Sequence, residues 1–179
     1  MKTAKLSALI LAVSVIVPAA AAHAQAPPPY GPPLSLDQGK KAMAAAEAEA
    51  RKNNWPVTIA FVDSGGNLVM MQRLDNTQFG SNEVARQKAH TAVAFKRPTK
   101  VFQDLIAQGG GNLRLLKVEG VSPLEGGMPI VVNGQIVGAI GVSGVTSQQD
   151  AQIGQAGAPW SRTGCRPGRR SGTSGRAGA

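Results

Sequence analysis

Two apolar segments with only an Asn-Gly pair between them restrict the fold of this chain more than any other feature of the sequence. Residues 128–132 and 135–142 are rich in Val and Ile, and Asn133-Gly134 joins them. Asn-Gly is favoured in two-residue hairpin loops, because both turn positions need a positive φ. The sequence therefore predicts an antiparallel pair of strands in the C-terminal half of the chain.

A second hairpin is predicted nearer the N-terminus. Residues 57–63 and 68–74 are strand candidates, and the glycine-containing segment 64–67 joins them. The first of these strands is apolar on both of its faces. We therefore expect it to lie inside the sheet and to be covered on both sides.

Helical patterns account for most of the remaining sequence. Ser35 and Gln38 have the spacing of a capping box, and small or apolar residues then recur every three or four positions as far as residue 50. Three further helices are predicted to span Ser81 to Arg97, Thr99 to the glycines at 109–111, and Thr146 or Ser147 to Ala156. The order helix, hairpin, two helices, hairpin, helix predicts an α+β fold, an antiparallel β-sheet packed with α-helices.

The two ends of the chain differ from this central part. Residues 1–24 have the basic start, apolar stretch and small-x-small ending of a secretory signal peptide, which predicts a periplasmic or secreted protein. Residues 25–33 are predicted to be a Pro-rich linker, and residues 34–157 the folded domain. No later segment is long and apolar enough to predict membrane insertion after signal cleavage.

Residues 158–179 are predicted to be a disordered basic tail rich in Gly, Arg and Ser. A basic arm for anionic surfaces, an extension without a role and the product of a shifted reading frame all fit this composition. The tail and the signal also account for most of the formal charge of +9, since residues 25–150 carry 12 Lys and Arg against 10 Asp and Glu. We therefore do not expect nucleic acid as a partner.

Cysteine and histidine are too few for several common kinds of site. Cys165 is the single cysteine, so no internal disulfide can form. After signal removal His90 is the single histidine, which argues against a structural zinc site. No familiar catalytic spacing is present, so we predict no catalytic residues.

Residues 85–95 are the segment most suggestive of ligand chemistry. His90 and Thr91 are neighbours on the predicted helix, and Lys88 and Arg86 are cations that can reach a carboxylate. Haem needs an axial ligand, apolar walls and cations for its propionates, and this segment offers part of each. The alternative is that His90 is an ordinary surface or packing residue.

Four segments, in this order and spacing, resemble the GlcG/HbpS-like family, also called the haem-degrading domain family, which includes the C-terminal domain of PduO. The resemblance extends over residues 34–157. The matching segments are residues 62–68, 86–92, 126–130, and 134 with 137–144.

The resemblance implies a profilin-like sandwich that assembles into homo-oligomers and binds haem or a related tetrapyrrole. It implies Thr91 as the first candidate for the iron ligand and His90 as the local alternative, with Lys88 and Arg86 contacting the cofactor. We therefore expect an exported haem-binding protein that captures, stores or protects haem. The alternatives are an oligomeric accessory module for another small ligand, such as a corrinoid, and a haem-degrading enzyme.

Overall fold

A computed structural model describes residues 26–158 of the chain. The predicted signal peptide and the tail beyond residue 158 lie outside the described residues. No helix in the described range is long and apolar enough to cross a membrane.

The four predicted strands form one antiparallel sheet. Its strands are β1 (Thr58–Asp63), β2 (Leu68–Arg73), β3 (Gly127–Val132) and β4 (Gln135–Ser143), in the order β2-β1-β4-β3. Both predicted hairpins are confirmed, and β1 is an inner strand that is buried except at its last residue. Asn133 and Gly134 both have positive φ, at 50° and 76°, as the β3–β4 turn requires.

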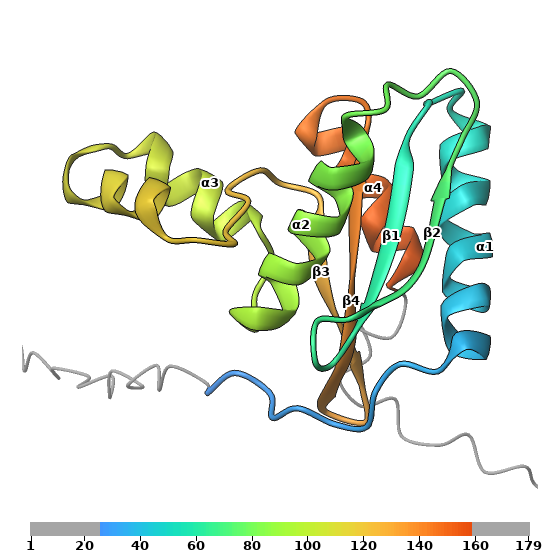
Figure 1. The fold of residues 1–179 in the computed structure, drawn as a ribbon, viewed down its shortest axis with the longest axis horizontal. Helices are drawn as coiled ribbons and strands as arrows, with labels where there is room; N and C mark the ends of the chain where they lie inside the picture. Colours follow the sequence, from blue (N-terminus) through green and yellow to red (C-terminus); the bar gives the residue numbers. More distant parts are fainter. Residues whose placement is uncertain (1–25, 159–179) are drawn as a thin grey trace, which may run out of the picture.

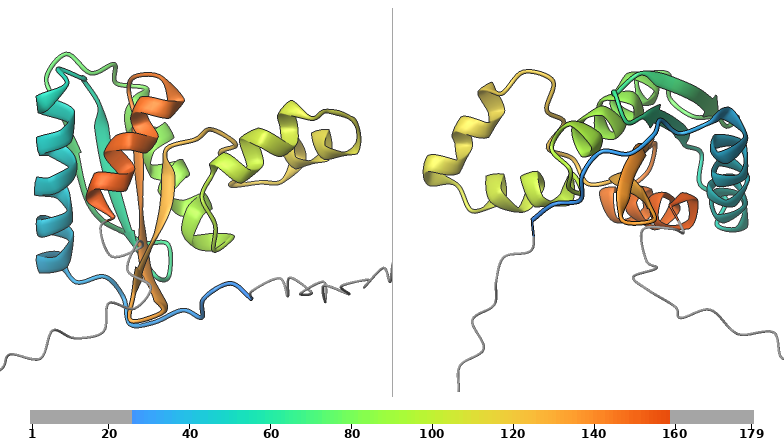
Figure 2. Two further views of the ribbon diagram at one scale, coloured as in Figure 1. Left: turned by 180° about the vertical axis from the view of Figure 1, so that it is seen from behind. Right: turned by 90° about the horizontal axis from the view of Figure 1, so that it is seen from below.

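Helices cover both faces of this sheet (Figures 1 and 2). The helix α2 (Ser81–Ala94) packs on one face, mainly against β4 and β1. On the other face α1 (Leu36–Lys52) and α4 (Ser147–Gly157) lie side by side. Alternate residues of β1 divide between the two cores: Ile59 and Phe61 belong to the cluster under α1 and α4, whereas Val62 belongs to the cluster under α2. The predicted α+β sandwich is confirmed.

Within residues 26–158, two of the α-helices begin with a side-chain cap and the other two do not. Capping boxes begin α1 at Ser35 and α4 at Thr146. In α2, however, Gly80 is the N-cap and Ser81 is already helical, and the helix ends at Ala94 rather than at residue 97. Thr99 precedes the helix α3 (Lys100–Ala107), but its hydroxyl accepts a hydrogen bond from the backbone N–H of Gly127 at 2.9 Å and does not cap the helix.

The segment between α2 and β3 forms an arm that sequence patterns did not predict. After α3 comes the 3₁₀ helix η1 (Gly110–Lys117), and the two project together from the side of the sandwich in Figure 1. We refer to residues 100–124 as the arm. Its exposed large apolar side chains are Val101, Leu113, Leu116, Val118 and Leu124.

The Pro-rich segment before α1 is extended but attached to the domain. The N–H of Gly31 donates to the carbonyl of Ile136, and the N–H of Ile136 donates to the carbonyl of Pro29, each at 2.9 Å. The hydroxyl of Tyr30 donates to the carbonyl of Val93 at 2.8 Å. These contacts fix residues 29–31 against the start of β4 and the end of α2, so this part is not a free linker.

Candidate functional site

The helix α2 carries all four predicted site residues and lies unusually close to the sheet. Its small residues Ala85 and Ala89 are fully buried against β4. A Cβ atom added at Gly141 of β4 would collide with the carbonyl oxygen of Ala85 and lie 2.5 Å from the backbone nitrogen of Ala89. The glycine therefore permits direct backbone packing, and it fixes which side chains of α2 face the core and which face outward.

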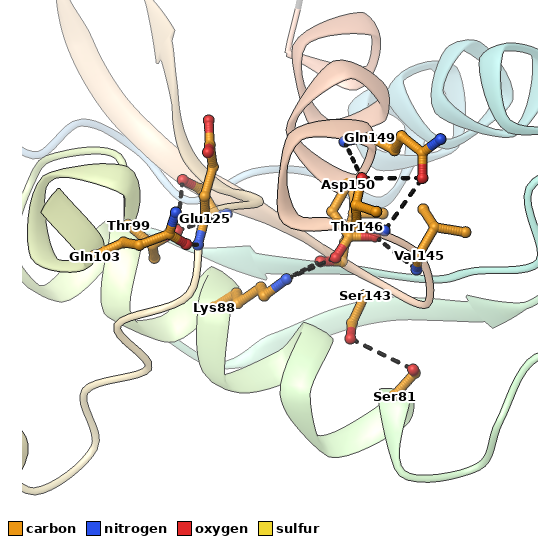
Figure 3. Close-up of polar contacts among 12 residues, drawn as sticks. Ser81, Lys88, Thr99, Gln103, Glu125, Ser143, Val145, Thr146, Gln149 and Asp150 are labelled. Carbon is orange, nitrogen blue, oxygen red and sulfur yellow. Dashed lines mark hydrogen bonds and ion pairs between the residues drawn. The ribbon is translucent and has the colours of Figure 1, made fainter. Parts of the chain in front are cut away.

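Lys88 points into the core, in contrast to the prediction that it contacts a cofactor carboxylate. Its side chain is 2% exposed, and Nζ donates to Oδ2 of Asp150 at 2.8 Å and to the carbonyl of Val142 at 2.9 Å (Figure 3). The ammonium is enclosed and already has a carboxylate partner, so this placement corrects the prediction. Lysine is rarely buried unless it is paired, and nothing in the local sequence identified Asp150 as the partner.

Asp150 is held from two sides. Besides Lys88, the backbone N–H of Val145 donates to its Oδ1 at 3.2 Å. Burial raises the pKa of Asp150 above its ordinary value, while the Lys88 ammonium and the hydrogen bond from Val145 act in the opposite direction. The ion pair joins α2, β4 and the start of α4, which makes it part of the framework behind the site.

Arg86 lies on the exposed surface of α2, one helical turn before His90. Its guanidinium binds both carboxylate oxygens of Glu83, through Nη2 at 2.6 Å and Nε at 3.0 Å. These hydrogen bonds lower the pKa of Glu83. An exposed ion pair of this kind contributes little to stability, so Arg86 can exchange Glu83 for a carboxylate of a ligand.

Thr91, the first candidate for an iron ligand, is fully buried. Its hydroxyl donates to the carbonyl of Gly120 at 3.1 Å and accepts from the N–H of Ser122 at 2.8 Å. The end of the arm therefore covers Thr91, and the hydroxyl proton and one lone pair are in use.

His90 is half-buried in a niche between two glycines. A Cβ atom at Gly66, in the β1–β2 turn, would lie 3.0 Å from Cδ2 and 3.4 Å from Nε2 of the imidazole. A Cβ atom at Gly120 would lie 3.9 Å from Cε1. Both glycines have positive φ, at 84° and 74°. No hydrogen bond or ion pair of the imidazole occurs within residues 26–158, so its nitrogens are free to bind a ligand there.

Two other features of the described residues bear on the kind of ligand. Residues 26–158 contain no cluster of three or more His, Cys, Asp or Glu side chains that could hold a bare metal ion. A cavity of about 330 Å³ lies near Trp55 and Leu74, by the beginning of β1. His90 lies by the turn after the end of β1, and none of the four predicted residues lines that cavity.

The comparisons with known proteins agree with the family that the sequence motifs suggested. Residues 34–159 match the family model described as "Haem degrading protein HbpS-like". Protein GlcG of Escherichia coli K12 is 40% identical over 110 residues, which is 62% of this chain and 81% of GlcG.

Two solved structures share the fold. A double mutant of HbpS from Streptomyces reticuli superposes with a TM-score of 0.66 at 31% identity, covering 83% of this chain and 97% of that protein. A complex of PduOC with heme superposes with a TM-score of 0.65 at 29% identity, covering 71% of this chain and 94% of PduOC.

Proposed function

The chain belongs to the HbpS-like family of haem-degrading proteins, and from this we propose that it binds haem at the exposed edge of His90 on α2. One observation supports His90 as the residue that binds haem. The imidazole is a good iron ligand, it is only partly buried, and it has no hydrogen-bond partner within the described residues. The haem complex of the relative PduOC supports the choice of ligand.

The residues near His90 fit a haem group. Arg86 is exposed one turn away and is available for a propionate. Val118, an exposed apolar side chain two residues before the glycine that lines the His90 niche, would provide part of a hydrophobic surface for a porphyrin. When bound, haem would supply an iron centre capable of ligand binding and electron transfer. The protein's own part is to provide the imidazole, the apolar surface and a cation.

The geometry favours His90 over Thr91 as the iron ligand. Thr91 is fully buried under the end of the arm and uses its proton and one lone pair on Gly120 and Ser122, so it would have to become exposed before its oxygen could reach an iron. His90 needs no such rearrangement. Lys88 has no direct role in this proposal, because its ammonium is enclosed with Asp150.

We further propose that the protein acts outside the cytoplasm in haem capture, storage or protection. The signal-like residues 1–24 support export, and the apolar arm supports self-association into homo-oligomers. Binding without catalysis is the function we favour, because the sequence contains no familiar catalytic spacing. A related tetrapyrrole such as a corrinoid is the second ligand class.

Hemin titration of the mature protein tests the proposal. We expect a shift of the Soret band with wild type, a strong loss of affinity with His90→Ala and a smaller loss with Arg86→Gln. Gln148→Ala, which changes an exposed side chain of α4 on the other face of the sheet, is the matched control and should bind as wild type. An unshifted spectrum at micromolar hemin, or equal binding by His90→Ala, would refute the assignment.

Native mass spectrometry of protein purified from the periplasm complements the titration. It reports the mass of the processed chain, the number of subunits and any tetrapyrrole that stays bound. Loss of the Soret band with release of iron under ascorbate, in the presence of catalase, would instead identify degradation.

A further inference from the structure

The buried hydroxyl of Thr91 connects α2 to the end of the arm. It lies one residue after His90 and holds both Gly120, through the carbonyl, and Ser122, through the N–H. Ser122 is itself buried, so its N–H has no access to water as a substitute. A buried donor of this kind needs a partner, and Thr91 provides it.

The return of the arm to the sheet uses side-chain oxygens as well as backbone hydrogen bonds. After Ser122, the N–H of Glu125 donates to Oε1 of Gln103 at 2.9 Å (Figure 3). The N–H of Gly127 then donates to Oγ1 of Thr99, and the N–H of Val142 donates to the carbonyl of Gly126 at 3.0 Å. Among these side-chain acceptors Thr91 is the first along the chain, and it is the one adjacent to the candidate ligand.

Gly120 contacts Thr91 and also lines the niche of His90. Its carbonyl is held by Thr91, and the position of its missing Cβ lies 3.9 Å from Cε1 of His90. A ligand bound to Nδ1 of the imidazole would lie beside this residue, because the position of the missing Cβ of Gly120 is 4.0 Å from Nδ1. Any displacement of Gly120 acts directly on the hydroxyl of Thr91, because the two are hydrogen-bonded.

We propose that Thr91 is a positioning residue, which holds segment 118–122 beside His90 and couples haem binding there to the position of the arm. This inference rests on the proposed function, because it takes His90 as the ligand. It assigns Thr91 a role other than iron coordination. The consequence is that haem changes the exposure of the arm's apolar side chains, since they lie on the segment that Thr91 attaches.

Hydrogen–deuterium exchange of the mature protein, with and without hemin, tests the coupling. In wild type we expect hemin to change the exchange rate of peptides covering residues 118–124 severalfold, while β4 peptides stay unchanged. Thr91→Val removes both hydrogen bonds, so these peptides should exchange about tenfold faster without hemin, which is the effect of losing about 1.4 kcal/mol of protection. Thr91→Ser keeps the hydroxyl and should behave as wild type.

Optical titration separates positioning from coordination. A positioning role predicts weaker hemin binding by Thr91→Val, an unaltered spectrum at saturation and rescue by Thr91→Ser. An altered saturated spectrum in Thr91→Val would identify Thr91 as the iron ligand and overturn the inference. Circular dichroism checks that Thr91→Val folds, and the wild-type exchange measurement tests the coupling without any variant.

The outcomes also separate this inference from the proposed function. No Soret shift with wild type overturns the proposed function and the coupling together. Hemin binding with unchanged exchange across residues 118–124 overturns the coupling alone.

Discussion

Replacing Asp150 by alanine removes the carboxylate that faces the buried ammonium of Lys88. The two side chains are 3% and 2% exposed, and 2.8 Å separates Oδ2 from Nζ. Removing one partner of a buried ion pair costs about 3–5 kcal/mol, because the other charge stays buried without compensation. The N–H of Val145 also loses its acceptor, which adds about 1 kcal/mol. A domain of ordinary stability has roughly 5–15 kcal/mol, so Asp150→Ala should remove a large part of the stability of this domain.

Urea denaturation followed by circular dichroism measures this effect. We expect Asp150→Ala to lower the free energy of unfolding by about 4–6 kcal/mol and Lys88→Met by about 3–5 kcal/mol. The double variant Lys88→Met with Asp150→Ala removes both charges and should lose much less than the two single losses together. A loss below about 1 kcal/mol for Asp150→Ala, or full additivity in the double variant, would refute the interpretation of the pair as an enclosed, mutually dependent unit.

Two further predictions concern the same framework. Burial raises the pKa of Asp150 in the folded state above its ordinary value of 3.8. Between 3.8 and the raised pKa, the folded state therefore keeps a proton that the unfolded chain releases. The contribution of Asp150 to stability falls as pH rises through this window. Asp150→Asn should abolish that fall in urea denaturation at successive pH values, whereas a wild-type gain in stability over the same window would mean that Lys88 outweighs burial. Gly141→Ala should destabilise by about 3 kcal/mol, the upper end for overpacking, since the new methyl group meets the backbone of α2. Gly111→Ala adds a methyl group in open space and is the control; equal unfolding midpoints for the two variants would contradict the close packing of α2 on β4.

The sequence predicted those parts of the fold whose signals are local. Asn133-Gly134 sets a turn through its own backbone conformations, and Ser35 with Gln38 caps α1 through atoms three residues apart. The burial of β1 followed from its own apolar residues. In each case the residues that carry the signal are also the residues that make the contacts.

The sequence failed where a contact joins distant parts of the chain. Thr99 has the right chemistry for an N-cap, but its hydroxyl binds Gly127, 28 residues away. Of the arm, the helix α3 was predicted but η1 was not, because the glycines at 109–111 indicated a break. Secondary-structure propensity depends only on the residues within a segment. It therefore cannot predict a contact with a partner elsewhere in the chain.

The candidate site shows the same contrast between local signals and distant contacts, within four residues of one helix. Lys88, His90 and Thr91 were grouped because a single helical segment contains them, but successive helical positions differ by about 100°, so neighbours along the chain point in different directions. The partner of Lys88 is 62 residues away and that of Thr91 about 30, and these partners determine which side chain is enclosed, which fastens the arm and which is left for a ligand. The motif therefore indicated one helix for the haem-site proposal, and the packing of β4, α4 and the arm around that helix is the reason why we propose His90 as the ligand.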